Sequence, residues 1–393
     1  MRPMQLTKSR NEVRAINDKP KPKRPRKRWK RIVKWTLGTI LVVLILWGFV
    51  AYWTSTNDCG RDTAAPTNPI KAIVYCDYGS PDVLKLVDIE KPVPNDDEVL
   101  VKVRAASVNP ADGIYKGGAR ILTGLRKPKD TRLGVDYAGT VEAIGKNVTQ
   151  FKQGDDVFGG RDGAFAEYVC ARADRAIALK PANITFEQAA SVPIAGITAL
   201  QGLRDKGKVQ AGQKVLINGA SGGVGTFAVQ IAKSFGAEVT GVCSTRNLDM
   251  VRSIGADHVI DYTKEDFTRS AERYDVIFDN IGNHSFSERR RILNPNGICV
   301  MVGVGGAGAT GGQIMGVLGG ELNAYVRSRF VSEKFGTFLA SLNKEDLTIL
   351  GDLMRSGKVT PVIDRTFTLS QLPQAMRYLE TGHARGKVVI TVE

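Results

Sequence analysis

The stretch "KVLINGASGGVGTFAVQIAKSFGA", residues 214–237, reads as an apolar strand, a glycine-rich turn and an amphipathic helix. The dinucleotide fingerprint G-x-G-x-x-G falls on Ala220, Gly222 and Gly225, with Ala in place of the first glycine. Such glycines let the backbone approach a pyrophosphate and let the helix pack on the strand, while the helix N-terminus supplies amide donors. The stretch therefore predicts a dinucleotide site, whose expected contacts are Ala220, Ser221, Gly222, Gly223, Val224 and Gly225.

The pattern around this stretch predicts an α/β protein. Further strands at helix-length spacing are "EVTGVC", "HVIDY", "DVIFDN" and "ICVMVG", which predict a doubly wound, Rossmann-type parallel sheet over residues 195–335. Residues 70–194 instead show short alternating runs separated by Gly, Pro and Asp, which are typical of an antiparallel β domain. Residues 336–393 hold two amphipathic helices, at 344–356 and 372–381, and a last strand "GKVVITV".

The residues after the second parallel strand indicate which cofactor binds. An NAD site places Asp or Glu at that strand end for the ribose hydroxyls, whereas this chain has Ser244, Thr245 and Arg246 after Cys243. Hydroxyls and a guanidinium suit a 2′-phosphate, so NADPH is favoured over NADH. The alternative for Arg246 is an exposed residue in the first turn of a helix.

The net charge of +15 is concentrated at the N-terminus. Residues 1–35 contain 14 Lys or Arg against two acidic residues, which leaves a net charge of +3 on the rest. The tail is expected to be disordered, because its prolines and like charges oppose helix formation. A body so close to neutrality argues against nucleic-acid binding.

Residues 36–54 are predicted to form a transmembrane helix, followed by a linker over residues 55–69. The segment has no charged residue and is long enough to cover about 27 Å of a bilayer core of roughly 30 Å. A cleaved signal peptide is the alternative. The positive-inside rule predicts a single-pass membrane protein with a cytoplasmic N-terminus. The side on which the body lies stays open, because that rule places it outside whereas NADPH is mainly cytosolic.

The five cysteines form no CxxC pair and no even framework. We expect them to be reduced thiols or small core residues, with neither a zinc ribbon nor a disulfide scaffold.

Several separated motifs resemble the medium-chain dehydrogenase/reductase superfamily. They are "ASVNPADGIYKGG", "GVDYAGTVEAIG", "SVPIAGITALQGL", "GASGGVG" and "GADHVIDY". Their order is similar to the zinc-independent quinone oxidoreductase branch, also called zeta-crystallin-like, over residues 70–393. The resemblance implies a GroES-like catalytic domain at 70–194, to which residues 336–393 return.

The resemblance also implies site residues. Asn109, Asp112 and Tyr115 are expected at a cleft beside the nicotinamide, where an Asn amide would donate to a substrate carbonyl and Tyr would donate or relay a proton. The alternative is that Asn109 and Asp112 cap the helix that opens at Pro110. Further implied cofactor contacts are Tyr262, Asn280, Gly303 and Lys387. For Lys387, a surface position is the plainer alternative.

No metal is expected. Zinc-dependent relatives would have Cys at Asn109 and a His-Glu pair at Val135 and Asp136, and zinc needs thiolate or imidazole ligands.

The leading hypothesis is a membrane-anchored, zinc-independent, NADPH-dependent oxidoreductase that transfers hydride to a quinone or an α,β-unsaturated carbonyl. The alternatives are an alcohol or aldehyde reductase and a noncatalytic NADPH-binding membrane protein. The expected partners are this small substrate, the lipid bilayer and a second copy in a homodimer, with no nucleic acid.

Overall fold

The computed structural model describes residues 26–53, 59, 65–117, 126–129, 131–302 and 331–392, with the side chains of residues 26–33, 44 and 51 excepted. Two compact units are distinguished, Met1–Thr54 and Ser55–Glu393. The first contains helix α1, and the second contains all other described elements. The domain boundaries expected within residues 55–393 stay a prediction, because those residues form one unit.

Helix α1 spans Arg26–Trp53 and begins directly after Pro25, ten residues earlier than the expected helix. Lys and Arg are good helix formers, so the basic block after that proline joins the helix. The described apolar side chains from Trp35 to Trp53 are largely exposed, with Trp35 at 78%. The expected transmembrane helix over 36–54 is not supported: in the part of the chain that the structure describes, no helix combines the length and apolarity that a membrane span requires.

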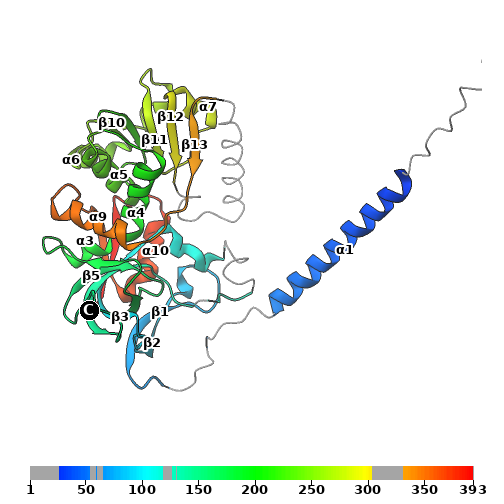
Figure 1. Ribbon diagram of the computed structural model, residues 1–393, viewed down its shortest axis with the longest axis vertical. Helices are drawn as coiled ribbons and strands as arrows, with labels where there is room; N and C mark the ends of the chain where they lie inside the picture. Colours follow the sequence, from blue (N-terminus) through cyan, green and yellow to red (C-terminus); the bar gives the residue numbers. More distant parts are fainter. Residues whose placement is uncertain are drawn as a thin grey trace, which may run out of the picture. The chain divides into compact units, whose positions relative to one another are not determined.

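A seven-stranded sheet forms most of the lower lobe in Figure 1, with strand order β14-β15-β3-β4-β5-β7 and β6 paired with β3. Its pairs are antiparallel except β14 with β15. This confirms the mostly antiparallel domain and shows that the C-terminal segment returns to it. The strands are β3 (Glu98–Val108), β4 (Asp136–Ile144), β5 (Asp156–Gly160), β6 (Tyr168–Arg172), β7 (Ile177–Leu179), β14 (Ile363–Thr368) and β15 (Lys387–Thr391). A separate antiparallel pair consists of β1 (Pro69–Val74) and β2 (Lys85–Glu90).

The second sheet has six parallel strands in the order β10-β9-β8-β11-β12-β13. It confirms the Rossmann-type sheet and its five expected strands, and adds β13 as a sixth. The strands are β8 (Lys214–Asn218), β9 (Glu238–Cys243), β10 (His258–Asp261), β11 (Tyr274–Asp279), β12 (Leu293–Met301) and β13 (Lys334–Thr337). The strand order reverses between β8 and β11, which is where ligands bind in open parallel sheets, at the carboxyl ends.

Helices cover this sheet and the junction between the lobes. The α-helices are α3 (Phe186–Ala190), α4 (Pro193–Gln201), α5 (Gly223–Ser234), α6 (Leu248–Ser253), α7 (Phe286–Arg291), α9 (Lys344–Arg355) and α10 (Leu372–Glu380). The short helical segments are η1 (Pro81–Val83), η2 (Pro110–Lys116), η3 (Gly202–Lys206), η4 (Thr245–Asn247), η5 (Phe267–Arg269) and η6 (Leu369–Gln371). Helices α9 and α10 confirm the two amphipathic helices expected after residue 336.

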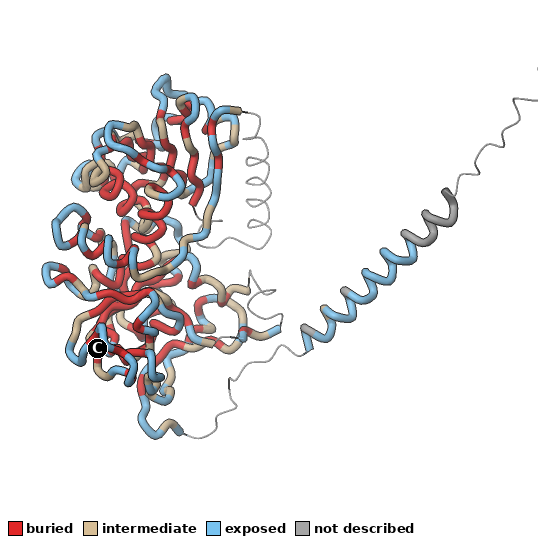
Figure 2. Tube along the Cα trace, viewed as in Figure 1, coloured by how far each residue is buried: buried red, intermediate tan, exposed pale blue. Residues whose placement is uncertain are grey.

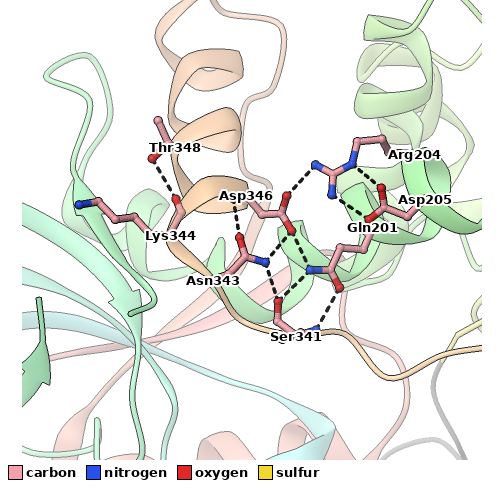
Figure 3. Close-up of polar contacts among 8 residues, drawn as sticks. All are labelled: Gln201, Arg204, Asp205, Ser341, Asn343, Lys344, Asp346 and Thr348. Atoms are coloured by element: carbon pink, nitrogen blue, oxygen red, sulfur yellow. Dashed lines mark hydrogen bonds and ion pairs between the residues drawn. The ribbon is translucent and has the colours of Figure 1, made fainter. Parts of the chain in front are cut away.

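A buried carboxylate fastens the start of α9 to the end of α4. Asp346 accepts hydrogen bonds from Arg204 at 2.6 Å and from Gln201 at 2.7 Å (Figure 3). Asn343 caps the helix by accepting from the Asp346 N–H at 2.8 Å. Burial raises the pKa of Asp346, but the hydrogen bonds from Arg204 and Gln201 outweigh it and leave that pKa lowered. These hydrogen bonds replace the ones that the Asp346 carboxylate loses to water when it is buried.

The buried residues form two large clusters, of which one lies within the antiparallel lobe and the other extends from the parallel sheet to one face of the antiparallel sheet, with a smaller cluster on the opposite face of the parallel sheet. Figure 2 shows buried positions along the strands of both sheets and along the helices between them, whereas the described side chains of α1 are mostly exposed. None of the described residues in these clusters belongs to α1.

The residue before β15, Gly386, joins the two sheets. Gly386 pairs with Gly222 in an isolated parallel bridge, and its N–H donates to the Ser221 carbonyl oxygen at 2.9 Å. Gly386 has a φ of +97°, and a Cβ there would lie 2.3 Å from the Val362 carbonyl oxygen. Glycine is therefore required at this junction, on both conformational and steric grounds.

Cys59 and Cys76 form a disulfide, so the expectation that all five cysteines are reduced was wrong for this pair. The two cysteines are 17 positions apart along the chain, and their Cα atoms are 5.7 Å apart; Cys76 lies two residues after the end of β1. Cys170, Cys243 and Cys299 are not part of a disulfide, and the latter two are buried.

Candidate functional site

A cavity of about 450 Å³ lies between the two lobes. Its lining is contributed by the glycine turn, the carboxyl ends of β11 and β12, the end of β3 and the segment from α10 to β15. The lining residues are Val108, Asn109, Pro110, Ala195, Gly219, Gly222, Gly223, Val224, Gly225, Asn280, Ile281, Val302, Leu379, Gly382, Ala384, Gly386, Lys387 and Val388. The cavity is mostly apolar, and the side chains that give it polarity are Asn109, Asn280 and Lys387.

The glycine turn forms one wall of this cavity. Strand β8 ends at Asn218, Gly219 takes a φ of +80°, and α5 begins at Gly223. A Cβ on Gly225 would lie 2.1 Å from the Gly219 carbonyl oxygen, so glycine is needed for the helix to pack on the turn. Gly222 is open by comparison, since its nearest neighbour would be 3.5 Å away. The open backbone and the amides at the start of α5 fit a pyrophosphate.

The two other predicted residues of the turn do not line the cavity. Ala220 is fully buried beneath it. The Ser221 hydroxyl accepts a hydrogen bond from the Asn247 amide at 3.0 Å, which ties the turn to the segment after β9. Asn247 was not anticipated, because its contact depends on the approach of two strand ends.

The predicted phosphate-binding residues lie beyond this wall, at the carboxyl ends of β9 and β10. Ser244 caps η4 and accepts from Asn247 at 3.1 Å, and Tyr262 is 56% exposed. The Arg246 guanidinium donates to the His383 carbonyl oxygen at 2.8 Å, so it reaches across to the segment that precedes β15. The three side chains do not line the cavity itself.

The same edge holds a carboxylate that the sequence analysis missed. Asp261 ends β10 and accepts from the Thr245 hydroxyl at 2.5 Å and from the Thr263 hydroxyl at 2.7 Å. These hydroxyl donors, with Thr245 first, lower the pKa of Asp261 to about 2. The NAD fingerprint places its carboxylate at the end of β9, whereas Asp261 lies at the end of the neighbouring strand, β10.

A buried polar cluster lies at the base of the cavity. The Lys387 ammonium donates to Asn109 Oδ1 at 2.7 Å, to the Val108 carbonyl oxygen at 3.3 Å and to Asp136 Oδ2 at 3.4 Å. Asn109 Nδ2 donates to Asp136 Oδ2 at 3.0 Å. Burial lowers the pKa of Lys387, although the two nearby carboxylates, Asp136 and Asp112, raise it. The plainer expectation of a surface position for Lys387 is not met, since it is 3% exposed.

Asp112 lies one step behind this cluster. Its Oδ2 accepts the Asn109 backbone N–H at 2.6 Å, which is the capping role considered from the sequence. Burial raises the pKa of Asp112 to about 7, with a further increase from Asp136 and opposing effects from the Asn109 N–H and Lys387. Asp112 does not line the cavity.

Tyr115 points elsewhere. Its hydroxyl donates to Glu380 Oε1 at 2.6 Å, and burial together with this carboxylate raises the pKa of Tyr115. Tyr115 is also absent from the cavity lining. The structure therefore brings Asn109 and Lys387 together at the cavity, whereas Asp112 and Tyr115 sit behind it.

Asn280 follows β11 and borders the opposite side of the cavity. Within the described residues, neither its Oδ1 nor its Nδ2 has a hydrogen-bond partner, although both atoms are buried. A buried amide without a partner costs free energy, so a ligand that bonds with it is favoured here. Gly303, the remaining predicted cofactor contact, lies outside the described residues.

The donor set at the cluster does not fit zinc. Asn109 and Val135 occupy the positions where zinc-dependent relatives would have Cys and His, and the Asn109 oxygen already accepts from a lysine ammonium. Among the residues that the structure describes, no group of three His, Cys, Asp or Glu side chains is placed to hold a metal ion.

Two family models match this chain. Residues 95–181 match the alcohol dehydrogenase GroES-like domain, and residues 254–390 match the zinc-binding dehydrogenase model.

Curated relatives extend over most of the chain. The chloroplastic NADPH-dependent alkenal/one oxidoreductase of Arabidopsis thaliana is 37% identical over 336 residues, covering 82% of this chain and 79% of the relative. The human mitochondrial NAD(P)H oxidoreductase RTN4IP1 is 34% identical, covering 84% of this chain and 91% of the relative.

Solved structures share the fold. The quinone oxidoreductase from Coxiella burnetii has a TM-score of 0.71 and 35% identity, covering 83% of this chain and all of that one. The Escherichia coli quinone oxidoreductase in complex with NADPH has a TM-score of 0.68 and 26% identity, covering 82% and 99% of the two chains.

The titration of Asp112 predicts a pH-dependent effect of Asp112→Asn on stability. Because the pKa of Asp112 is raised to about 7 on folding, the folded state binds its proton more tightly than the unfolded chain, and stability falls as the pH rises from about 4 to about 7. The variant keeps an oxygen for the Asn109 N–H but cannot ionise. We expect it to gain about 2–3 kcal/mol at pH 8 relative to its effect at pH 5, measured by denaturant unfolding.

The control for that measurement is Asp174→Asn. Asp174 is exposed, and the hydrogen bond from Arg172 lowers its pKa, so its small pH-dependent effect has the opposite sign. An Asp112→Asn effect of equal size at both pH values would contradict the prediction.

Proposed function

The chain belongs to the medium-chain dehydrogenase/reductase superfamily, and on this premise we propose that it is an NADPH-dependent, zinc-independent reductase of quinones or α,β-unsaturated carbonyls. The observation that carries the proposal is a cavity lined both by the glycine turn and by the Asn109–Lys387 cluster. The names of the relatives, an alkenal/one oxidoreductase and quinone oxidoreductases, support the zeta-crystallin-like branch and this substrate class.

The residues present fit a dinucleotide. The glycine turn and the start of α5 would hold the pyrophosphate, while Ser244, Arg246 and Tyr262 would hold the 2′-phosphate end. Asn280, whose amide atoms are buried without a hydrogen-bond partner among the described residues, would bond with the part of the cofactor inside the cavity. When bound, NADPH supplies a hydride; the chain's own residues bind and orient it and exclude water from the apolar cavity.

The polar cluster supports substrates that accept hydride readily. An unactivated carbonyl needs a strong electrophile such as a metal ion, whereas Asn109 and Lys387 offer neutral or already paired groups. Quinones and enones carry their own electron-accepting conjugation, so orientation beside the cofactor contributes more to their reduction.

A steady-state assay tests this function. With NADPH as donor, we expect kcat/KM for a quinone or an enone to exceed that for a saturated aldehyde by about tenfold or more, which is 1.4 kcal/mol of transition-state stabilisation. Preference for the aldehyde would favour an alcohol or aldehyde reductase. Tight NADPH binding without turnover of any acceptor would favour a noncatalytic binding protein. Loss of activity with a chelator would contradict zinc independence.

Arg246→Ala tests the preference for NADPH. The guanidinium is charged and planar, and one hydrogen bond to a charged group contributes about 1.5–3 kcal/mol, so we expect KM for NADPH to rise about tenfold or more. KM for NADH should change little. Arg252→Ala is the control, because Arg252 is an exposed arginine paired with Asp249 on α6. An equal increase in KM for both cofactors would remove Arg246 from the phosphate site.

The location of the chain is a separate proposal, which rests on the sequence. We propose that residues 36–54 attach the protein to a membrane with the basic tail in the cytoplasm. The Cys59–Cys76 disulfide supports an oxidising compartment for residues 55–393, since such bonds are rare in the cytosol. A homodimer also stays a proposal, which the mass of the purified protein in solution tests.

Truncation tests this attachment. We expect the full chain to sediment with membranes after alkaline washing, whereas a chain that begins at residue 61 and carries Cys76→Ser stays in the supernatant. The shortened chain should still show an NADPH-induced increase in Tm, because the described residues of the core clusters all lie after α1. A full chain released by the wash would contradict the attachment. Loss of the Tm increase would show that the N-terminal segment is part of the fold.

A further inference from the structure

Asp136, the first residue of β4, is the one member of the polar cluster that is completely buried and to which no function has been given above. Its Oδ1 accepts the Ile194 N–H at the start of α4, at 3.0 Å. Its Oδ2 accepts from the Ser107 hydroxyl at 3.0 Å, from Asn109 Nδ2 at 3.0 Å and from the Lys387 ammonium at 3.4 Å. One carboxylate therefore connects β3, α4 and β15 at the base of the cavity.

The contacts of Asp136 fix the direction of the Asn109 amide. An ionised carboxylate only accepts hydrogen bonds, and an ammonium only donates them. With Asp136 on one side and Lys387 on the other, Nδ2 must face the carboxylate and Oδ1 must face the ammonium. A reversed amide would place two acceptors together and two donors together. The assignment of the amide thus follows from its charged neighbours.

This arrangement changes the role expected for Asn109. Its Nδ2 donates to Asp136 and, at 3.4 Å, to the Ser107 carbonyl oxygen, so both of its hydrogens are in use. The hydrogen-bonding capacity that is left is a lone pair of Oδ1, which is an acceptor. The amide is therefore not available to donate to a substrate carbonyl unless its bond with Asp136 breaks.

Asp136 favours the charged form of Lys387, because its charge and its hydrogen bond raise the pKa of the ammonium against the effect of burial. The ionisable groups that face its ammonium are Asp136 from β4 and Asp112 from η2, and burial opposes the charged form. On the other side, the aliphatic stem lies against the glycine turn, since a Cβ on Gly223 would be 3.1 Å from Lys387 Cδ. Lys387 thus holds a position between the turn and Asn109.

Asp136 does not line the cavity, whereas two of the three side chains that it bonds, Asn109 and Lys387, do. We propose that Asp136 is a positioning residue of the active site, which holds the Asn109 amide in one orientation and keeps the Lys387 ammonium charged beside it. The expected effect on kcat rests on the proposed function. The expected effect on cofactor binding rests on the geometry of the cluster alone.

The test compares Asp136→Asn with the unmodified chain. An amide at position 136 can donate as well as accept, so Asn109 is no longer held in one direction, and Lys387 loses a counter-charge. We expect kcat to fall about 10- to 100-fold, as small misplacements in active sites do, while KM for NADPH changes less than about threefold. The alkaline decline of kcat should begin at lower pH, because Lys387 gives up its proton more readily without the carboxylate.

A second readout does not depend on turnover. In a fluorescence titration with NADPH over the same pH range, we expect the alkaline loss of affinity to begin at lower pH in Asp136→Asn than in the unmodified chain. If the unmodified chain binds NADPH but reduces no acceptor, the proposed function fails, and this titration alone decides the role of Asp136. An unshifted pH dependence would then overturn that role.

Two further variants separate positioning from folding. Asp346→Asn removes a carboxylate that is buried at 3% exposure and fully hydrogen-bonded but lies outside the cavity (Figure 3). It should lower Tm without moving the pH profile. Asp136→Glu keeps the charge but displaces it by one methylene, so it should lower kcat with the pH profile retained, and it serves if Asp136→Asn does not fold. A loss of Tm alone in Asp136→Asn, or an unchanged kcat in Asp136→Glu, would overturn the proposal.

Discussion

The backbone hydrogen bond from Gly386 to the Ser221 carbonyl is the contact on which the site depends. It places the last strand of the antiparallel sheet against the glycine turn of the parallel sheet, and only a glycine fits there. Because Lys387 is the next residue, the same contact directs its stem along the turn and its ammonium to Asn109. The position of the cluster is thus a consequence of how one strand begins.

The cluster is difficult to explain as a source of stability. A buried ion pair often stabilises the folded state less than well-packed apolar residues of the same size would, by about 1–4 kcal/mol, because both ions lose their water. Here the loss is offset by a full set of donors to Asp136 and of acceptors for Lys387. Such an arrangement fixes the orientation of the Asn109 and Lys387 side chains more than it stabilises the fold. Because the cluster lies at the base of the cavity, these orientations determine which polar atoms face a ligand there.

The parts of the fold that are local in sequence could be predicted, and the parts that are long-range could not. The glycine turn, the parallel strands, the antiparallel domain and the helices over residues 344–355 and 372–380 follow from patterns within short windows. The contacts of Asp136 and Asp261 could not be predicted, because Asp136 bonds with β3, α4 and β15 and Asp261 bonds with Thr245 of η4. The Cys59–Cys76 bond could not be predicted, because it depends on the path of the chain between the two cysteines, which includes β1. The pairing of Tyr115 with Glu380 joins residues 265 apart, beyond what any local pattern carries.

The disulfide gives the chain two covalent routes from Cys59 to the core. When the disulfide is reduced, a force applied from the N-terminal side reaches β1 at Pro69 and acts on the end of the β1–β2 pair where Pro69 lies opposite Glu90. When it is oxidised, the load passes through sulfur to Cys76, beyond the other end of β1, and the 17-residue separation is bypassed. The redox state of one bond therefore decides which end of this two-stranded ribbon bears tension.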